Sequence, residues 1–203
     1  VSANAITFSA IDSVDGLAGD NEIIGFENQQ WQLSGTTNAI TGNDIDFTSI
    51  VKVTATNGTV IGTDNADAFL LSTGLNSDNQ VTANAITFSD VDVVMGGIGD
   101  DSVTGTSSDE EFTLVSTDKV SAKEITFSGI KTVDGGGGTN TITGTALANE
   151  FTLVDSNKVS ANGITFKSIA SVDGLGGDNE IIGFENQQWQ LSGTTNAITG
   201  NDI

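Results

Sequence analysis

The sequence predicts an all-β fold, a right-handed parallel β-solenoid (β-helix) in which short strands wind into stacked coils. Three observations support this prediction. A motif recurs roughly every 40 residues, apolar and polar residues alternate within it, and Gly, Asn and Asp separate the alternating runs. Repeats built from short strands are typical of solenoids, in which each coil buries its apolar face only against the neighbouring coils.

The repeat is clearest over its first eight residues. VSANAITF at 1–8 returns as VTANAITF at 81–88, VSAKEITF at 120–127 and VSANGITF at 159–166, with a weaker copy, ITGNDIDF, at 40–47. The chain is therefore one domain, 1–203, of repeating units at 1–39, 40–80, 81–119, 120–158 and 159–197, followed by a partial unit at 198–203. Residues 1–45 also match 159–203 at 40 of 45 positions, which defines a super-unit of 158 residues. We expect the chain to be a window cut from a longer tandem array.

Each unit contains several short runs with the alternation of a strand. Examples are AITF at 85–88, NEIIG at 21–25, EFTLV at 150–154 and KVSA at 158–161. In the unit that starts at residue 120, Ile125 and Phe127 share one face while Thr126 takes the other, which is the period of a strand and not of a helix. Each unit also divides into two half-units, so we expect about ten coils of roughly 20 residues, two per 39-residue unit.

Aromatic residues recur once in each half-unit. One series is Phe8, Phe47, Phe88, Phe127 and Phe166, and the other is Trp31, Phe69, Phe112, Phe151 and Trp189. Regular recurrence along a whole chain is typical of a core and not of an active site. We expect these rings to form interior stacks along the rod.

Composition argues against several function classes. The net charge is −21, and the chain has six Lys but no Arg, His or Cys. Nucleic-acid binding depends on cations that neutralise phosphates, so no nucleic-acid partner is expected. No apolar run is long enough to span a bilayer, so membrane insertion is not expected either.

Catalytic residues are not predicted. Parallel β-helix enzymes that act on acidic polysaccharides would need a basic group beside a carboxylate cluster. The acidic pairs Asp100–Asp101 and Asp109–Glu110 could in principle act on a glycosidic bond, but they fall in turns of a near-identical array. We expect solvated turns at both pairs and a protein that is not an enzyme.

The glycine-rich turns contain the one motif with metal-binding chemistry. GGIGDDSVT at 96–104 fits the calcium-binding nonapeptide G-G-x-G-x-D-x-U-x with Asp101 at the acidic position, whereas Asn21, Asn140 and Asn179 occupy that position elsewhere. The motif appears once per unit, so a full cage of six to eight oxygen ligands is not evident. We expect stacked Asn and Asp side chains that hydrogen-bond along the rod, with no required cofactor and no metal-site residues; Ca²⁺ is the alternative.

The unit at 40–80 is irregular. LLSTGLNSDNQ at 70–80 lengthens its outer loop, and insertions into solenoids usually become loops on one face. We expect a tolerated variation in loop length here, and the loop near Leu75 is otherwise the candidate for a specialised binding surface.

The phrase ITFSGIKTVDGGGGTNTITGTALANEFTLV at 125–154 resembles the repeats of very large bacterial exoproteins. These are the β-strand-repeat, filamentous-haemagglutinin-like surface proteins and adhesins. The resemblance covers essentially the whole chain. It implies a secreted solenoid at the bacterial cell surface, and it leaves the partner unspecified.

Two functions follow as expectations. The first is a non-catalytic structural segment of a long extracellular fibre or adhesin stalk that associates with further repeats or identical chains. The alternative is a calcium- or carbohydrate-binding repeat module of a secreted exoprotein, in which the glycine-rich turns or the loop near Leu75 would form the binding surface.

Overall fold

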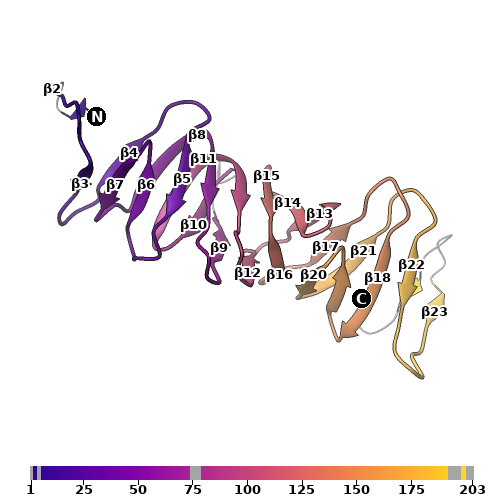
Figure 1. The fold of residues 1–203 in the computed structure, drawn as a ribbon. Helices are drawn as coiled ribbons and strands as arrows, with labels where there is room; N and C mark the ends of the chain where they lie inside the picture. The colour runs from indigo at the N-terminus through magenta and orange to yellow at the C-terminus, as the bar shows by residue number, and fades with distance from the viewer. Residues whose placement is uncertain (1, 4–5, 74–78, 192–197, 200–203) are drawn as a thin grey trace.

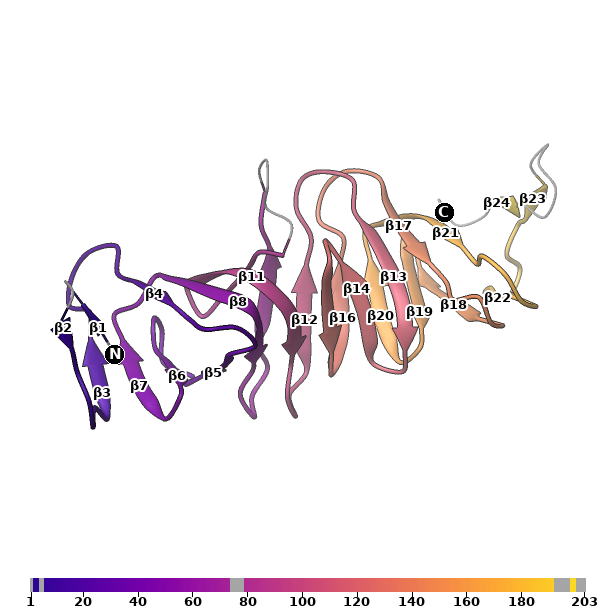
Figure 2. The same ribbon diagram turned by 90° about the horizontal axis from the view of Figure 1, so that it is seen from above.

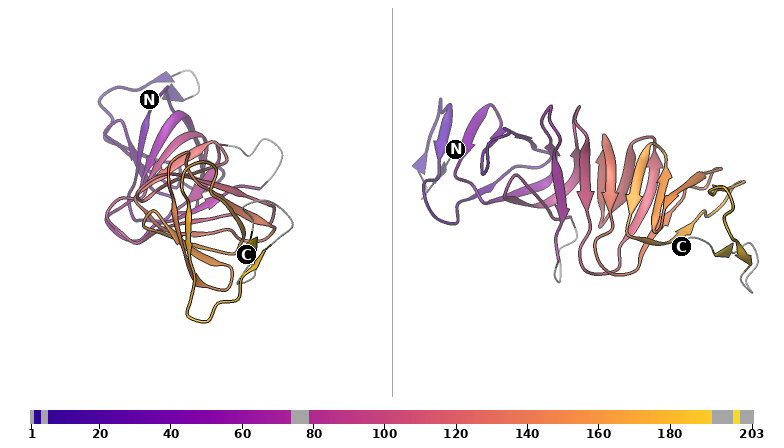
Figure 3. Two further views of the ribbon diagram at one scale, coloured as in Figure 1. Left: turned by 90° about the vertical axis from the view of Figure 1, so that its right-hand side faces the viewer. Right: turned by 90° about the horizontal axis from the view of Figure 1, so that it is seen from below.

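The computed structural model describes residues 2–3, 6–73, 79–191 and 198–199. Every regular element in this part of the chain is a strand, and the strands lie side by side along an elongated rod (Figure 1). The view from above keeps the same row of strands (Figure 2), and the view along the rod superimposes the coils (Figure 3, left). The loop near Leu75 lies outside the described residues. The predicted all-β fold is confirmed.

Most strands are short, and most of them alternate buried side chains with partly buried or exposed ones. They are β1 Ser2–Ala3, β2 Ile6–Thr7, β3 Ser13–Asp15, β4 Glu22–Ile24, β5 Gln30–Leu33, β6 Ile40–Gly42, β7 Ile45–Thr48, β8 Lys52–Ile61, β9 Ala68–Leu71, β10 Val81–Ala83, β11 Ile86–Met95, β12 Asp101–Thr104, β13 Glu111–Ser116, β14 Lys119–Ala122, β15 Ile125–Ser128, β16 Ile130–Asp134, β17 Asn140–Thr143, β18 Glu150–Asp155, β19 Lys158–Ala161, β20 Ile164–Lys167, β21 Ile169–Asp173, β22 Glu180–Ile182, β23 Gln190–Leu191 and β24 Ile198–Thr199.

Parallel pairing between successive coils confirms the β-solenoid. Phe112 on β13 pairs with Ile142 on β17, and Val133 on β16 pairs with Phe166 on β20. Each coil takes roughly 30 to 35 residues of chain, as the parallel partners Trp31 with Val60 and Val53 with Phe88 show. The chain therefore forms about six coils, and the expectation of ten shorter coils was wrong.

The error has a structural cause: part of each unit folds back as a hairpin. β18, β19 and β20 form an antiparallel meander, as do β13, β14 and β15, whereas the pairs between successive coils are parallel. Strands that lie side by side also do not occupy equivalent positions of the repeat. The adjacent strands β13, β17 and β21 come from three successive units, yet they have the different sequences EFTLVS, NTIT and IASVD. The coil length therefore differs from both the unit and the half-unit.

The same difference between neighbouring strands corrects the prediction of stacked rings. Eight of the ten rings are interior, as predicted: Trp31 and Phe47 are 3% and 6% exposed, and Phe69, Phe88, Phe112, Phe127, Phe151 and Phe166 are at most 1% exposed. The prediction was wrong for Phe8 and Trp189, which are 44% and 41% exposed. Their parallel-strand partners, however, are aliphatic: Phe127 pairs with Val94, and Phe151 pairs with Ile181. The described rings approach one another in two pairs, Trp31 with Phe47 at 6.3 Å and Phe112 with Phe166 at 6.4 Å between centroids. Along the rod, rings alternate with Val and Ile.

Two-residue turns close the hairpins that precede the ITF strands. Ala122 pairs with Ile125 and Ala161 with Ile164, which leaves Lys123–Glu124 and Asn162–Gly163 as the connecting residues. Both residues of each turn have positive φ, as a type I′ turn requires. Asn–Gly is the favoured pair for this turn, so Lys123 and Glu124 hold a conformation that suits them poorly.

Candidate functional site in the glycine-rich turns

The glycine-rich turns connect consecutive strands, as between β16 and β17, and they lie against a turn of the preceding unit. Gly97 and Gly136 have φ of 106° and 76°. A Cβ atom at these positions would lie 2.3 Å from the carbonyl oxygen of Thr63 and 2.2 Å from that of Thr106, respectively. Glycine is therefore required both for its positive φ and for the close approach of two backbones.

Asn140 links three successive coils through one buried side chain. Its Oδ1 accepts a hydrogen bond from the backbone N–H of Glu110 in the preceding coil at 2.9 Å. Its Nδ2 donates to the carbonyl of Gly137 in its own turn at 2.9 Å and to that of Ser168 in the following coil at 3.0 Å. Because the side chain is fully buried, these bonds satisfy groups that water does not reach.

The other asparagines at this position bond in the same way. Asn21 Nδ2 donates to the carbonyls of Leu17 and Ser49 at 3.1 and 3.0 Å. Asn179 Oδ1 accepts from the backbone N–H of Asn149 at 3.0 Å and from Asn149 Nδ2 at 2.8 Å. The expected hydrogen bonding of stacked side chains along the rod is therefore present, mostly from side chain to backbone.

Asp101 departs from this pattern. Its side chain is fully buried, and its Oδ1 accepts the backbone N–H of Asp67 at 2.8 Å, but its Oδ2 has no hydrogen-bond partner. Burial raises the pKa of Asp101, chiefly because it disfavours the charged carboxylate. In the part of the chain that the structure describes, no three His, Cys, Asp or Glu side chains converge in a way that could hold a metal ion.

The two acidic pairs are not the solvated turns that the sequence predicts. Asp100 and Asp109 are exposed, whereas their neighbours Asp101 and Glu110 are buried. Glu110 accepts hydrogen bonds from the N–H of Thr106 at 3.0 Å and from the Thr106 hydroxyl. Each pair contributes one carboxyl to the surface and one to the interior, so the two carboxyls do not share a site.

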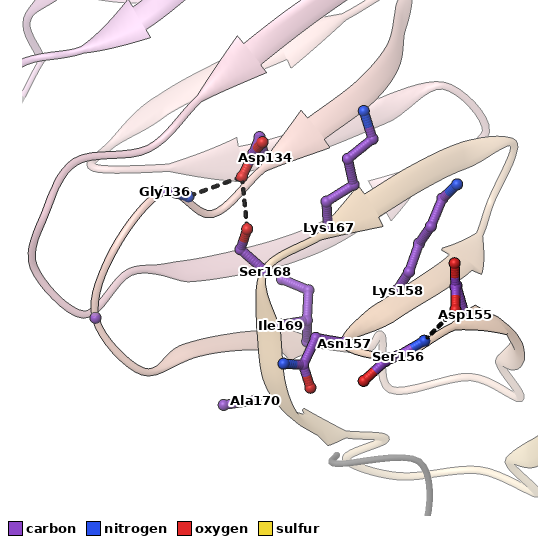
Figure 4. A pocket seen from close by; sticks show the side chains of 11 residues that line it. Asp134, Gly136, Asp155, Ser156, Asn157, Lys158, Lys167, Ser168, Ile169 and Ala170 are labelled. Carbon is purple, nitrogen blue, oxygen red and sulfur yellow. Dashed lines mark hydrogen bonds between the residues drawn. The ribbon is translucent and has the colours of Figure 1, made fainter.

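A surface pocket of about 550 Å³ lies beside the last complete coils (Figure 4). Lys158 on β19 and Lys167 on β20 are directly opposite each other across the antiparallel pair and extend in the same direction. Asp134, also in the lining, is engaged by the Ser168 hydroxyl at 2.8 Å and the Gly136 N–H at 3.0 Å. Two facing ammonium groups can attract an anion. The two lysines flank the Asn162–Gly163 turn symmetrically, and this symmetry is the sequence signal from which the pair could have been predicted.

Acidic side chains far outnumber basic ones, with 27 Asp and Glu against six Lys. One ion pair is present among the described residues, Lys131 Nζ to Asp118 Oδ2 at 2.8 Å. No helix of the described part is long and apolar enough to cross a membrane.

Comparisons with known proteins identify no family for this chain. No family model, no curated protein and no solved structure matches it. The resemblance to bacterial exoprotein repeats therefore rests on the sequence motifs alone.

Proposed function

We propose that this chain is a non-catalytic structural segment of a long extracellular fibre or adhesin stalk at a bacterial surface, extended by further coils at its ends. We also propose that its coils wind to the right, the hand that parallel connections adopt in nearly all proteins. The acidic surface, with a net charge of −21, suits a soluble rod whose neighbours repel one another sideways.

The observation that supports this proposal is a pair of identical strands with opposite free edges. β4 and β22 both read Glu-Ile-Ile. β4 pairs with β8 of the following coil, whereas β22 pairs with β18 of the preceding coil. Among the described residues, β4 is therefore unpaired on the side of the preceding coil, and β22 is unpaired on the side of the following coil. Open edges are templates for strand pairing, and edges that complement each other in this way favour head-to-tail assembly.

The internal register specifies how two chains would meet. β17 pairs with β21 so that Thr141 lies opposite Ser171. Glu180 stands one repeating unit after Thr141, and Ser13 stands one super-unit before Ser171. We therefore expect Glu180 of one chain to lie opposite Ser13 of the next, with Ile181 opposite Val14.

Disulfide cross-linking tests this register, because the chain has no cysteine of its own. Ser13→Cys and Glu180→Cys chains, mixed at high concentration and oxidised, should form a covalent dimer, since Cα atoms of paired strands lie within disulfide range. Glu22→Cys is the matched control: it occupies the same place on β4, where β8 already covers that edge. Electron microscopy should show rods in multiples of one chain length. Monomers at every concentration and no cross-link would contradict the proposal.

A further inference from the structure

The carboxyl of Asp101 occupies the place of an amide. A Cβ atom built on Gly96 would lie 2.5 Å from Asp101 Oδ2. In the other turns the corresponding Cβ atoms on Gly16, Gly135 and Gly174 would lie 2.6, 2.5 and 2.6 Å from an asparagine Nδ2. Asp101 Oδ1 accepts a hydrogen bond from the backbone N–H of Asp67 in the preceding coil, just as Asn140 Oδ1 accepts one from the backbone N–H of Glu110. Asp101 Oδ2 therefore lies where the asparagines of the other turns have Nδ2, which is a hydrogen-bond donor.

The asparagine amide at this position serves two backbone acceptors. The Asn140 Nδ2 donates to carbonyls three residues before it and 28 residues after it. The residues at these offsets from Asp101 are Ile98 and Gly129. An ionised carboxylate only accepts hydrogen bonds, so it cannot replace an amide N–H there, whereas a protonated carboxyl provides one O–H donor.

The charged groups around Asp101 disfavour its ionised form. Asp67 and Asp100 both act on it as like charges, and Lys131 is the one cation that acts in the opposite direction. Lys131 is already paired with Asp118, and Asp67 accepts hydrogen bonds from the N–H and hydroxyl of Thr63 at 2.6 and 3.0 Å. A bare carboxylate at Asp101 would therefore be a buried and largely uncompensated charge, which is costly.

We propose that Asp101 is a proton-binding site: its buried carboxyl is held as the neutral acid, its Oδ2–H donates to a backbone carbonyl, and loss of this proton weakens the junction between coils at the middle of the rod. The proton thus replaces one hydrogen of the asparagine amide found in the other turns. Asp101 Oδ1 accepts a hydrogen bond from the backbone of Asp67 in the preceding coil, so ionisation of the Asp101 carboxyl affects the contact between two coils.

The sign of the pH effect follows from the raised pKa. An unfolded Asp has a pKa of about 3.9. Between that value and the higher pKa of the folded state, the folded chain binds more protons than the unfolded chain, so stability falls as pH rises. The stabilisation by Asp101 is complete below about pH 4 and is lost as the pH rises through the folded pKa.

Asp101→Asn tests the proposal, because it installs the side chain that the other turns already have. We expect its melting temperature at pH 8 to exceed that of the unsubstituted chain by about 5 °C, the scale of relieving one buried unsatisfied group. The difference should shrink towards pH 4. Asp178→Asn is the matched control, since it removes the same charge from the exposed position before Asn179 in another turn and reports the general relief of surface repulsion. A gain no larger than that of Asp178→Asn would overturn the proposal.

A second measurement identifies the occupant of the site directly. Carboxyl ¹³C NMR across the same pH range should show one aspartate that stays protonated above the pH at which the exposed aspartates titrate, and Asp101→Asn should remove that signal. Calcium chloride, added after dialysis against chelator, should leave the melting temperature difference between the two chains unchanged. A calcium-dependent stabilisation that Asp101→Asn abolishes would overturn the proposal, because it would place a cation beside an ionised carboxylate.

Discussion

Residues 19–45 and 177–203 are identical in sequence, but the parts of them that the structure describes lie in different surroundings. Trp31 and Leu33 in the first segment are each 3% exposed, whereas their counterparts Trp189 and Leu191 are 41% and 80% exposed. β5 pairs with both β6 and β8, while β23 pairs only with β24 among the described strands. The residues are the same, so the difference in burial comes from the following coil. In a solenoid the core is a property of neighbouring coils and not of one repeat.

The largest expected effect tests this difference at the two tryptophans. Trp31→Ala should lower the free energy of unfolding by about 3–5 kcal/mol, because it leaves a large cavity between coils. Trp189→Ala should cost about 1 kcal/mol or less, since nearly half of that side chain already contacts solvent. Denaturant unfolding of both variants measures the two values. Equal losses would mean that the last coil is as well covered as the first.

The contrast also explains which parts of the structure were predictable. Ile125 and Phe127 are buried and Thr126 is not, as the two-residue alternation predicts, because alternation is a local property of a strand. The coil length was not predictable, since it depends on which strands become neighbours: Val133 pairs with Phe166 and not with another Val. The Asn and Asp turn was recognised as a hydrogen-bonding element. The burial of Asp101 was not, because the groups that cover it come from neighbouring coils, distant in sequence in both directions.

The second prediction compares Asn140, in the middle of the rod, with Asn179, at the same position of the last described glycine-rich turn. Asn140→Asp should lower the free energy of unfolding at pH 7 by about 1–3 kcal/mol, because Asn140 is fully buried and its Nδ2 serves two carbonyls. Asn179→Asp, at an exposed position, should have little effect. Burial raises the pKa of a carboxyl, so the loss at position 140 should diminish as the pH falls from 7 towards about 4. Unfolding curves at acidic and neutral pH measure both variants. A loss at position 140 that is independent of pH would indicate a packing defect and not an ionised carboxyl.

The smallest expected effect lies in the hairpin turns, where two neighbouring units differ in residues but not in conformation. Lys123–Glu124 and Asn162–Gly163 both have positive φ at each position, and the second pair suits a type I′ turn. Replacing Lys123 with Asn and Glu124 with Gly should therefore raise the free energy of unfolding, by about 0.5–1 kcal/mol for the pair, since the backbone no longer holds a strained residue. The glycine part of this gain is offset by the greater freedom of glycine in the unfolded chain, so Lys123→Asn alone should retain much of it. The reverse change, Asn162→Lys with Gly163→Glu, should lower the free energy of unfolding by at least this amount, because a Cβ atom at position 163 would also lie 2.5 Å from Asp118 Oδ1. If the two exchanges are not opposite in sign, the neighbouring strands and not the turn residues determine the stability of these hairpins.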